Sequence, residues 1–538
     1  MLGGSEMLRE LVLGTAALML GSTAARAEWR EASSKHFLVY SEGSEASLRA
    51  AVVKLEKYDF LLRFASGKLK APSGAKAKVY MVSDMKAVAA SLPFGGMGVG
   101  GYYEANLRGA YFVTPRSSVT DTVRGTYRVD PQQVLFHEYA HHFMFQYFPA
   151  TYPTWYSEGF AEYYGTTRLL PNEVMEVGQP ANHRYASLEG NQWLPVNKLL
   201  TARSYADVGS RLHLLYAQGW LLVHYAAFNK EAGAQLKQYL NAINAGQSYE
   251  TAAGAAFGAG AKQLNNALQD YARNGQLKVV RLPFKPIDVG PIVIRELSPA
   301  ENALLGEELA LDSGVPAADA GRFAARVRRT AARFPDDPHA LRVLTEAERL
   351  AGNRANAAAA VERWLAVQPG AALALMHKGA LRAEELRAAS SRDEAAWDAA
   401  RKLIFDAHRR APAEPQILVA YYDSFAAQGR LPPAGAQNGL VRAFELLPQN
   451  DDLRYRVAWD FEQRGMIEVA IQTIRPAALA FHEDETPERK ARREKREAEY
   501  RLAGEATRET AREMLMRLEA KFAGGKPAAA PKGGAGRR

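Results

Sequence analysis

The sequence predicts an α+β domain followed by an α-helical solenoid. Three observations support this class. Strand-like and helix-like apolar patterns follow one another over residues 28–275. Residues 276–297 carry β-branched residues and prolines, which suits a linker or small edge strands. Residues 298–482 are alanine-rich and helical, and prolines recur there at steps close to a repeat length.

Residues 1–27 have the pattern of a signal peptide. Arg9 precedes an apolar run, and small residues end at Ala27 in an A-x-A cleavage pattern. The run is shorter than the roughly 20 apolar residues that a spanning helix needs, and no later segment approaches that length. We therefore expect cleavage near Ala27, a mature chain without a transmembrane segment, and a periplasmic or secreted location.

The first part of the α+β domain alternates between strand and helix patterns. Residues 36–40 and 78–82 have strand composition, and an apolar stripe from Ala46 predicts a helix between them. The glycine-rich residues 94–101 precede another strand candidate, residues 109–114. Because these glycines match no phosphate-loop or dinucleotide fingerprint, we interpret them as a loop beside a sheet edge. Farther along, the pattern predicts a loop-rich section over residues 165–205 and helices over residues 211–273.

The spacing H-E-x-x-H at His137, Glu138 and His141 lies in an apolar segment with helical character. Asp130 is a suitable N-cap, and Pro131 suits the first helical position. Residues i and i+4 share one face of a helix, so two imidazoles can converge on one metal ion while the intervening glutamate reaches a metal-bound water. The segment is therefore predicted to be a buried helix that carries part of a metal site.

A second acidic motif, W-Y-S-E-G-F-A-E-Y-Y-G, occupies residues 155–165. Its Glu158 lies seventeen positions after His141 and could be a third, carboxylate ligand that leaves the fourth zinc position open. Glu162, one turn beyond, could accept a hydrogen bond from the outer nitrogen of a ligand histidine. The chain has no cysteine, so any zinc must be held by nitrogen and oxygen.

Together, H-E-Y-A-H and W-Y-S-E-G-F-A-E-Y-Y-G resemble the motifs of the gluzincin metallopeptidases, in particular the bacterial peptidase MA-like family. The likeness covers about residues 28–275 and implies a thermolysin-like zincin catalytic domain. It also implies one Zn²⁺ per chain, held by His137, His141 and Glu158, with Glu138 as general base. Members of this family often combine a signal peptide, this catalytic domain and tetratricopeptide repeats.

A further family element is a tyrosine that opens a Y-x-x-G segment, which Tyr216 matches in Y-A-Q-G. Its phenol would donate to the oxyanion of the tetrahedral intermediate. His213, one helical turn earlier, is an alternative donor, and either residue could instead be an ordinary packed or surface side chain. His142, His183 and His224 lack ligand spacing. Because His142 is rotated by about 100° from the neighbouring ligand on its helix, we interpret it as structural.

The aminopeptidase branch of the gluzincins has a G-x-M-E-N strand that binds the substrate amino terminus. Residues 101–106, G-Y-Y-E-A-N, depart from this pattern, which favours an endopeptidase over an exopeptidase. In gluzincins the sheet edge near the zinc helix binds substrate by strand addition. Residues 109–114 are our candidate for this edge.

The helical part shows a repeat length in its prolines. The steps between successive ones are 34, 43 and 36 residues, from Pro335 through Pro369 and Pro412 to Pro448. A period near 34 is typical of the tetratricopeptide repeat, a helix pair that buries its apolar face by stacking on its neighbours. The longer step fits an insertion near residues 388–393. We predict a tetratricopeptide-like solenoid that binds a protein partner, with an unrelated helical bundle as the alternative.

The C-terminal end is predicted to lie outside the packed domains. Residues 483–522 carry dense charges of alternating sign, which is typical of a solvated helix, and residues 523–538 are low-complexity and predicted to be disordered. The formal net charge of +9 is modest for 538 residues, and the motif region has no basic stripe. Nothing in this charge distribution predicts binding to nucleic acid.

Two functions follow from the sequence. In the first, the protein is an exported zinc-dependent endopeptidase whose repeats recruit a protein substrate or partner. In the second, an inactive peptidase-like domain serves with the repeats as an envelope protein-binding scaffold. The presence of both histidines and all three glutamates of the two motifs favours the enzyme, because a scaffold does not need them.

Overall fold

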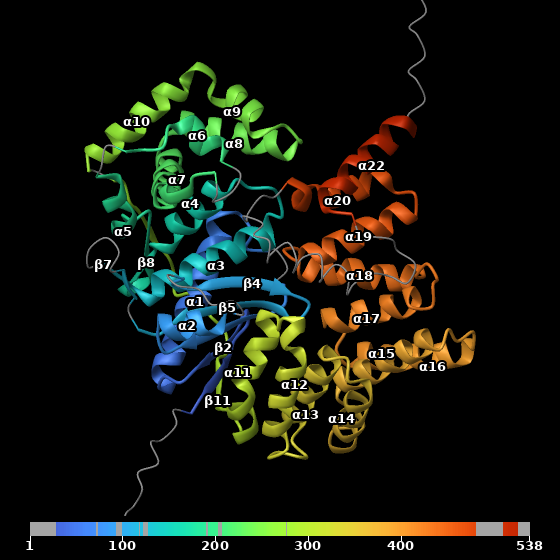
Figure 1. Cartoon of the computed structure of the whole chain (residues 1–538). Helices are drawn as coiled ribbons and strands as arrows, with labels where there is room; N and C mark the ends of the chain where they lie inside the picture. Colours follow the sequence, from blue (N-terminus) through green and yellow to red (C-terminus); the bar gives the residue numbers. More distant parts are fainter. Residues whose placement is uncertain are drawn as a thin grey trace, which may run out of the picture.

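The computed structural model describes residues 28–70, 74–92, 99–117, 119–121, 127–189, 192–202, 207–275, 277–479 and 509–525 (Figure 1). The predicted signal peptide and most of the predicted disordered tail lie outside these residues. Within the described part of the chain, no helix combines the length and the apolar character that crossing a membrane requires.

A six-stranded mixed sheet forms the base of the N-terminal region, with the strand order β11-β1-β2-β3-β5-β4. Strands β2, β3 and β5 are parallel, whereas β4 runs antiparallel to β5 at the edge. Helix α1 (Glu45–Ala65) connects β2 to β3, as a parallel pair requires a crossover. The strands are β1 (Arg30–Ser33), β2 (Phe37–Ser41), β3 (Ala77–Val82), β4 (Tyr102–Asn106), β5 (Gly109–Pro115) and β11 (Val293–Glu296).

The prediction that residues 109–114 form the sheet edge is wrong. They lie in β5, which pairs with β3 on one side and β4 on the other. All seven residues of β5 are buried, as expected for an interior strand, and the short β4 that precedes it takes the edge position instead. Both β4 and β5 contact the predicted metal helix, and the edge strand near it is Tyr102–Asn106.

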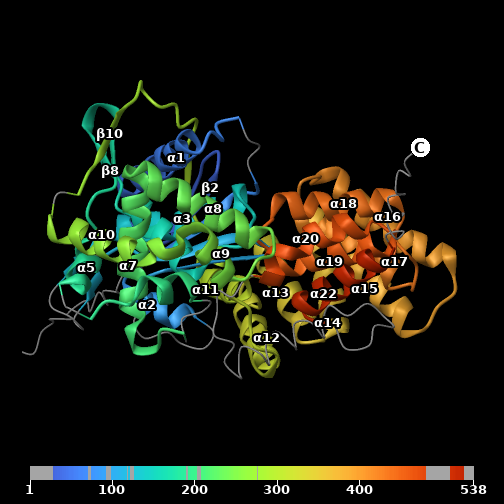
Figure 2. The same ribbon diagram turned by 90° about the horizontal axis from the view of Figure 1, so that it is seen from above.

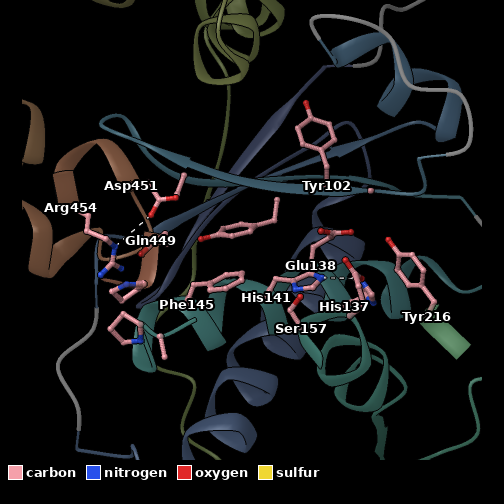
Figure 3. Close-up of a pocket in the computed structure, with 17 residues that line it drawn as sticks. Tyr102, His137, Glu138, His141, Phe145, Ser157, Tyr216, Gln449, Asp451 and Arg454 are labelled. Carbon is pink, nitrogen blue, oxygen red and sulfur yellow. Dashed lines mark hydrogen bonds and ion pairs between the residues drawn. The ribbon is translucent and has the colours of Figure 1, made fainter. Parts of the chain in front are cut away.

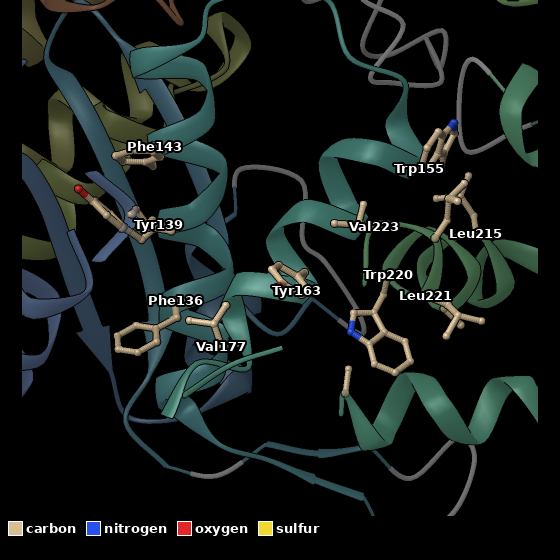
Figure 4. Packing of buried hydrophobic residues seen from close by; sticks show 14 of the residues in the cluster. Phe136, Tyr139, Phe143, Trp155, Tyr163, Val177, Leu215, Trp220, Leu221 and Val223 are labelled. Atoms are coloured by element: carbon tan, nitrogen blue, oxygen red, sulfur yellow. The ribbon is translucent and has the colours of Figure 1, made fainter. Parts of the chain in front are cut away.

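Three helices pack above the sheet and carry the two motifs. Helix α3 (Pro131–Tyr147) begins where the Asp130 side chain accepts a hydrogen bond from the Gln132 amide. It contacts α4 (Thr154–Gly165), which in turn crosses α7 (Leu212–Phe228). Figure 4 shows the shared core, which includes Phe136, Tyr139, Phe143, Trp155, Tyr163, Leu215, Trp220 and Leu221.

The crossing of α4 and α7 depends on two glycines. A Cβ atom added to Gly159 would lie 2.4 Å from the carbonyl oxygen of Gly219, and one added to Gly219 would lie 2.4 Å from the carbonyl oxygen of Trp155. Only residues without a side chain allow the two backbones to approach this closely. This contact fixes the position of α4 and so of Glu158, which precedes Gly159.

The section predicted to be loop-rich, residues 165–205, contains short regular elements. Strands β8 (Arg168–Leu170) and β9 (Val174–Val177) form a small sheet with β10 (Val280–Pro283). Strands β10 and β11 belong to the segment predicted as a linker or small edge strands, and they add one strand to each of two sheets. The other elements are α2 (Met85–Ser91), β6 (Val119–Asp121), β7 (Tyr127–Val129), α5 (Asn182–Tyr185), α6 (Val196–Thr201), α8 (Lys230–Asn244), α9 (Tyr249–Phe257) and α10 (Ala261–Arg273).

Residues 298–479 form ten helices and no strand, which confirms the predicted helical array. Each proline of the repeat pattern lies in a link between an even-numbered helix and the next odd-numbered one, so the helices form five pairs from α11 to α20. The longest step corresponds to α15 and α16, which have 17 residues each. The bounds are α11 (Pro299–Ser313), α12 (Ala317–Ala331), α13 (Pro338–Leu350), α14 (Arg354–Val367), α15 (Ala372–Ala388), α16 (Glu394–Arg410), α17 (Pro415–Ala426), α18 (Ala434–Leu446), α19 (Asp451–Gln463) and α20 (Ile467–Leu479).

The helical array curves around one side of the N-terminal region and contacts it at two places (Figures 1 and 2). Near its start, Arg108 Nε lies 2.6 Å from Asp312 Oδ1 of α11. Near its end, Leu107 packs against the apolar cluster of α17–α19, and Thr151 Oγ1 donates to the Pro476 carbonyl of α20 over 3.3 Å. The last helix pair is thereby held beside α3 and β4.

Where the structure describes residues 483–522, the predicted helix is present, but the prediction that it is solvated is wrong. Helix α22 (Ala511–Gly525) packs on α20, and its Met514, Leu515 and Leu518 are buried. These three residues share one helical face that the dense charges obscure in the sequence. The helix also continues past the predicted boundary at residue 522, whereas residues 480–508 lie outside the described part.

Candidate metal centre

His137, His141 and Glu158 meet at one point between α3 and α4. The Nε2 atoms of His137 and His141 are 3.2 Å apart, and Glu158 Oε2 lies 3.4 Å from the first and 3.5 Å from the second. Three ligands of a tetrahedral Zn²⁺ with bonds of about 2.0–2.1 Å stand about 3.3–3.4 Å from one another. The triangle of ligand atoms therefore has the size that a zinc ion requires.

The three ligand groups are strongly coupled. Burial opposes ionisation of Glu158, but the charges and hydrogen bonds of the two histidines hold its pKa well below the usual range. Burial also disfavours the charged form of His137, yet the hydrogen bond to Glu158 and the charge of Glu162 raise the pKa of His137 to about 9. Because a metal ion must displace protons from its ligands, we expect zinc affinity to fall as pH falls.

Glu162 lies behind the ligand triangle. Its Oε1 is 3.6 Å from Nδ1 of His137 and accepts a hydrogen bond of 2.7 Å from Arg184 Nε, while its Oε2 is 3.4 Å from His183 Nε2. The Arg184 guanidinium also stacks over the ring of Tyr216 at 4.4 Å. Sequence reasoning missed Arg184 and set His183 aside for lack of ligand spacing, since no motif spacing connects α5 with α3 or α4.

Glu138 lines the cavity that contains the triangle. Burial raises the pKa of its carboxyl group, although the two histidines oppose this shift. A carboxylate with a raised pKa is a better proton acceptor at neutral pH than an ordinary glutamate. Tyr216 lines the same cavity, whereas His213, the alternative donor, is absent from the described residues that line it.

The remaining histidines of interest have structural surroundings. His142 is buried among Tyr103, Phe112 and Tyr139, and burial lowers its pKa to about 3. His224 Nε2 lies 3.0 Å from the Gly178 carbonyl oxygen. Neither ring faces the triangle.

The cavity has a volume of about 460 Å³, within the range of small-ligand sites. Figure 3 shows His137, Glu138 and His141 toward the end that Tyr216 occupies, and Gln449, Asp451 and Arg454 at the opposite end. The walls come from β4, α3, α4, α7 and the last helix pair of the array. The cavity is thus formed by both halves of the chain.

No family model matches this sequence, and none of the curated proteins matches it. Among solved structures, the chain is similar to a thermophilic TPR protein of Thermus thermophilus, with 18% identity and a TM-score of 0.29 over 42% of this chain and 99% of that one. It is also similar to the MamA RS-1 ArsTM double mutant, with 14% identity and a TM-score of 0.25 over 34% of this chain and 93% of that one. TM-scores of this size do not establish a shared fold.

Proposed function

We propose that the protein is a zinc-dependent peptidase of the gluzincin type. The supporting observation is the triangle of His137 Nε2, His141 Nε2 and Glu158 Oε2, whose sides of 3.2–3.5 Å fit the ligands of one tetrahedral ion. A zinc ion held there would supply a Lewis acid that polarises the peptide carbonyl and lowers the pKa of water. The proposal requires one Zn²⁺ per chain.

The side chains around the triangle have matching roles in this proposal. Glu138 takes a proton from the attacking water and passes it to the leaving amine. Tyr216 donates a hydrogen bond to the oxyanion that develops on the carbonyl. Glu162, whose Oε1 lies 3.6 Å from Nδ1 of His137, attracts the outer nitrogen and so favours the ring orientation that points Nε2 at the triangle. Arg184 contacts both Glu162 and Tyr216 and fixes their relative positions.

Strand β4 is the proposed site for the substrate backbone. It is the edge of the sheet within the described residues, and residues 101–103 and Ala105 line the cavity. A Cβ atom added to Gly101 would lie 3.5 Å from Cγ of Glu138, so the beginning of β4 adjoins the proposed base. An extended peptide that pairs with this edge would pass directly over the triangle.

We further propose that the mature protein acts in the periplasm or outside the cell and that the helical array binds a protein substrate or partner. Helical arrays of this kind offer extended surfaces for other proteins. The alternative, an inactive domain within a binding scaffold, has the same fold and differs only in turnover.

The decisive experiment measures zinc content and cleavage of a peptide library by the wild type and by Glu138→Gln. The amide keeps the shape of the carboxyl group but cannot accept the proton. We expect equal zinc content and a loss of turnover of about 10²–10⁴-fold. Equal cleavage rates at full zinc occupancy would exclude Glu138 as the base, and a zinc-binding protein that cuts nothing would favour the scaffold.

A further inference from the structure

The last helix pair of the array forms one wall of the candidate catalytic cavity. Gln449, Asp451 and Arg454 lie at the start of α19, more than 300 positions after His141, yet they line the same cavity. Pro476 of α20 also lines it and is held there by the hydrogen bond from Thr151, which follows α3. The array is therefore part of the site as well as a separate surface.

This wall presents a carboxylate to the cavity. The Asp451 side chain is 68% exposed, whereas that of Arg454 is 7% exposed. The terminal nitrogens of Arg454 donate to the carbonyls of Pro448 and Thr473, over 2.6 and 3.2 Å, and its Nε stands 3.5 Å from Asp451 Oδ1. A ligand that enters the cavity therefore meets the carboxylate, while the guanidinium is occupied by the protein.

Gln449 lies beside Asp451 in the same wall, but its amide group is not accessible to a ligand. Both polar atoms of the amide are enclosed by protein, and the hydroxyl of Tyr103 on β4 lies next to them. The exposed carboxylate of Asp451 is therefore the group of this wall that a ligand can reach.

An acidic residue in the first turn of a helix is common, because it interacts favourably with the helix dipole. Asp451 and Asp452 both occupy the first turn of α19, so the dipole explains either of them equally well. Only Asp451 lines the cavity. A comparison of substitutions at Asp451 and Asp452 therefore distinguishes an effect on the helix from an effect in the cavity.

The direction of β4 shows which part of a substrate would reach this wall. The strand begins beside Glu138, at Gly101, and ends at the hairpin of Leu107, which packs on the array. A peptide paired antiparallel with β4 would have its residues before the scissile bond directed toward the array. Tyr103 lies two positions along the strand from Gly101, a distance of about 7 Å in an extended strand. The hydroxyl of Tyr103 lies near Gln449.

We propose that Asp451 binds a cationic group of the substrate on the amino-terminal side of the scissile bond. This inference rests on the proposed peptidase function and deepens it. The group is either the free α-ammonium of a short amino-terminal segment or the side chain of a lysine or arginine. Asp451 acts as a specificity-determining residue, and the helical array thereby contributes to substrate selection within the site.

The test uses the full zinc-loaded chain and three matched peptide libraries. The first has free amino termini and no lysine or arginine, the second is the same but N-acetylated, and the third is N-acetylated with lysine introduced before the cleavage site. We expect the first or third library to exceed the second in kcat/KM by about 10–100-fold, as for a hydrogen bond to a charged group. Preference for the first library identifies the amino terminus, and preference for the third identifies the side chain.

Asp451→Asn should reduce the ratio of kcat/KM between the cationic and the neutral library to near one, mainly through KM. The matched control Asp452→Asn should keep the wild-type ratio. The inference is overturned if the wild type cuts the neutral library equally well. It is also overturned if Asp451→Asn keeps the preference or if both variants lose it equally.

Binding measurements keep this test separate from the proposed catalysis. The same peptides, made fluorescent, are titrated into zinc-loaded Glu138→Gln with and without Asp451→Asn. If the zinc-loaded wild type cut no peptide while Glu138→Gln showed a cation preference that depends on Asp451, the inference would stand and the proposed peptidase would be refuted. Zinc-dependent cleavage without any such preference would do the reverse.

Discussion

Among the described residues of the N-terminal region, two clusters each combine histidine with acidic residues and have the composition of a metal site. One is His137, His141 and Glu158; the other is His36, Glu56 and Asp59. In each cluster the candidate ligand atoms lie within 4.8 Å of one another. Composition and proximity therefore cannot distinguish the two clusters. They differ in the protein groups that already contact their ligand atoms.

In the second cluster the protein itself supplies the cations and donors. Asp59 Oδ2 lies 2.7 Å from Arg63 Nε, and its Oδ1 accepts from the Tyr139 hydroxyl over 2.6 Å. Glu56 accepts from the backbone amide of His36 over 2.9 Å and lies 2.6 Å from its Nδ1. A metal ion would have to compete with Arg63 in a buried site, which electrostatic repulsion opposes.

In the first cluster the two imidazoles and the carboxylate meet at one point in the wall of the cavity. Glu158 contacts both histidines, and the Arg184 guanidinium pairs with Glu162 behind the triangle. We infer that the first cluster holds a metal and that the second holds α1 against α3 and β2. Each prediction below tests this division.

The largest expected effect is the loss of zinc. His141→Gln removes one of three protein ligands and should reduce zinc content from one ion per chain to nearly none. His36→Gln, the matched control in the second cluster, should leave one ion per chain. Elemental analysis of the folded proteins measures both. Zinc loss in the control alone would reverse the assignment of the clusters, and two zinc ions in the wild type would show that both clusters bind metal.

The next effect is on stability and should appear in the second cluster. Arg63 and Asp59 form an i,i+4 pair on α1 whose side chains are 7% and 2% exposed, whereas Arg49 and Glu45 form the same pair on the same helix with 46% and 61% exposure. Arg63→Ala leaves a buried carboxylate and should cost about 3–5 kcal/mol of unfolding free energy. Arg49→Ala should cost less than about 1 kcal/mol.

Denaturant titration measures both variants, with zinc content as a second readout. Arg63→Ala should unfold at lower denaturant yet bind one zinc ion when folded, because the second cluster supports the fold without contributing ligands. Equal costs for the two arginines would contradict the structural role of the buried pair.

Part of the metal centre follows from local sequence rules, and part does not. The i,i+4 spacing of His137 and His141 requires only one helix, and Glu158 lies on the next helix along the chain, so their proximity was predictable. Arg184 comes from a short helix with no periodic pattern. Asp451 reaches the cavity only because the array curves back, a property that no short segment of sequence contains.

The fold divides in the same way. Prolines in the links predicted the helix pairs of the array, since each pair is a local unit that contacts its neighbours in sequence. In the sheet, β4 takes the edge position that was predicted for β5, because pairing is decided by partners far along the chain and by burial on both sides. The apolar face of α22 was likewise hidden by a high density of charges.

The smallest expected effect concerns His224, which forms no ion pair with an acidic residue within the described part of the chain. His224 is fully buried on α7, with Nε2 near the Gly178 carbonyl and Nδ1 3.0 Å from the Tyr271 hydroxyl. Burial holds the pKa of His224 below its ordinary value in the folded protein. The unfolded chain, with a pKa of about 6.5 at this position, therefore binds more protons than the folded one below that pH.

This contribution to stability is present above about pH 6.5 and declines as pH falls through that value, with a limiting slope of about 1.4 kcal/mol per pH unit. His224→Gln can keep a hydrogen bond but cannot take up a proton, so it should flatten the dependence of unfolding free energy on pH below 6.5. Urea titrations at pH 8, 6 and 5 measure the slope. Above pH 7, the free energies of unfolding of the wild type and of His224→Gln should differ by a constant amount. Below pH 7 the two values should converge, because only the wild type loses stability through proton uptake at this position. Parallel curves across the whole range would show that burial does not keep His224 neutral. His224 would then not differ in its protonation from the histidines that contact carboxylates.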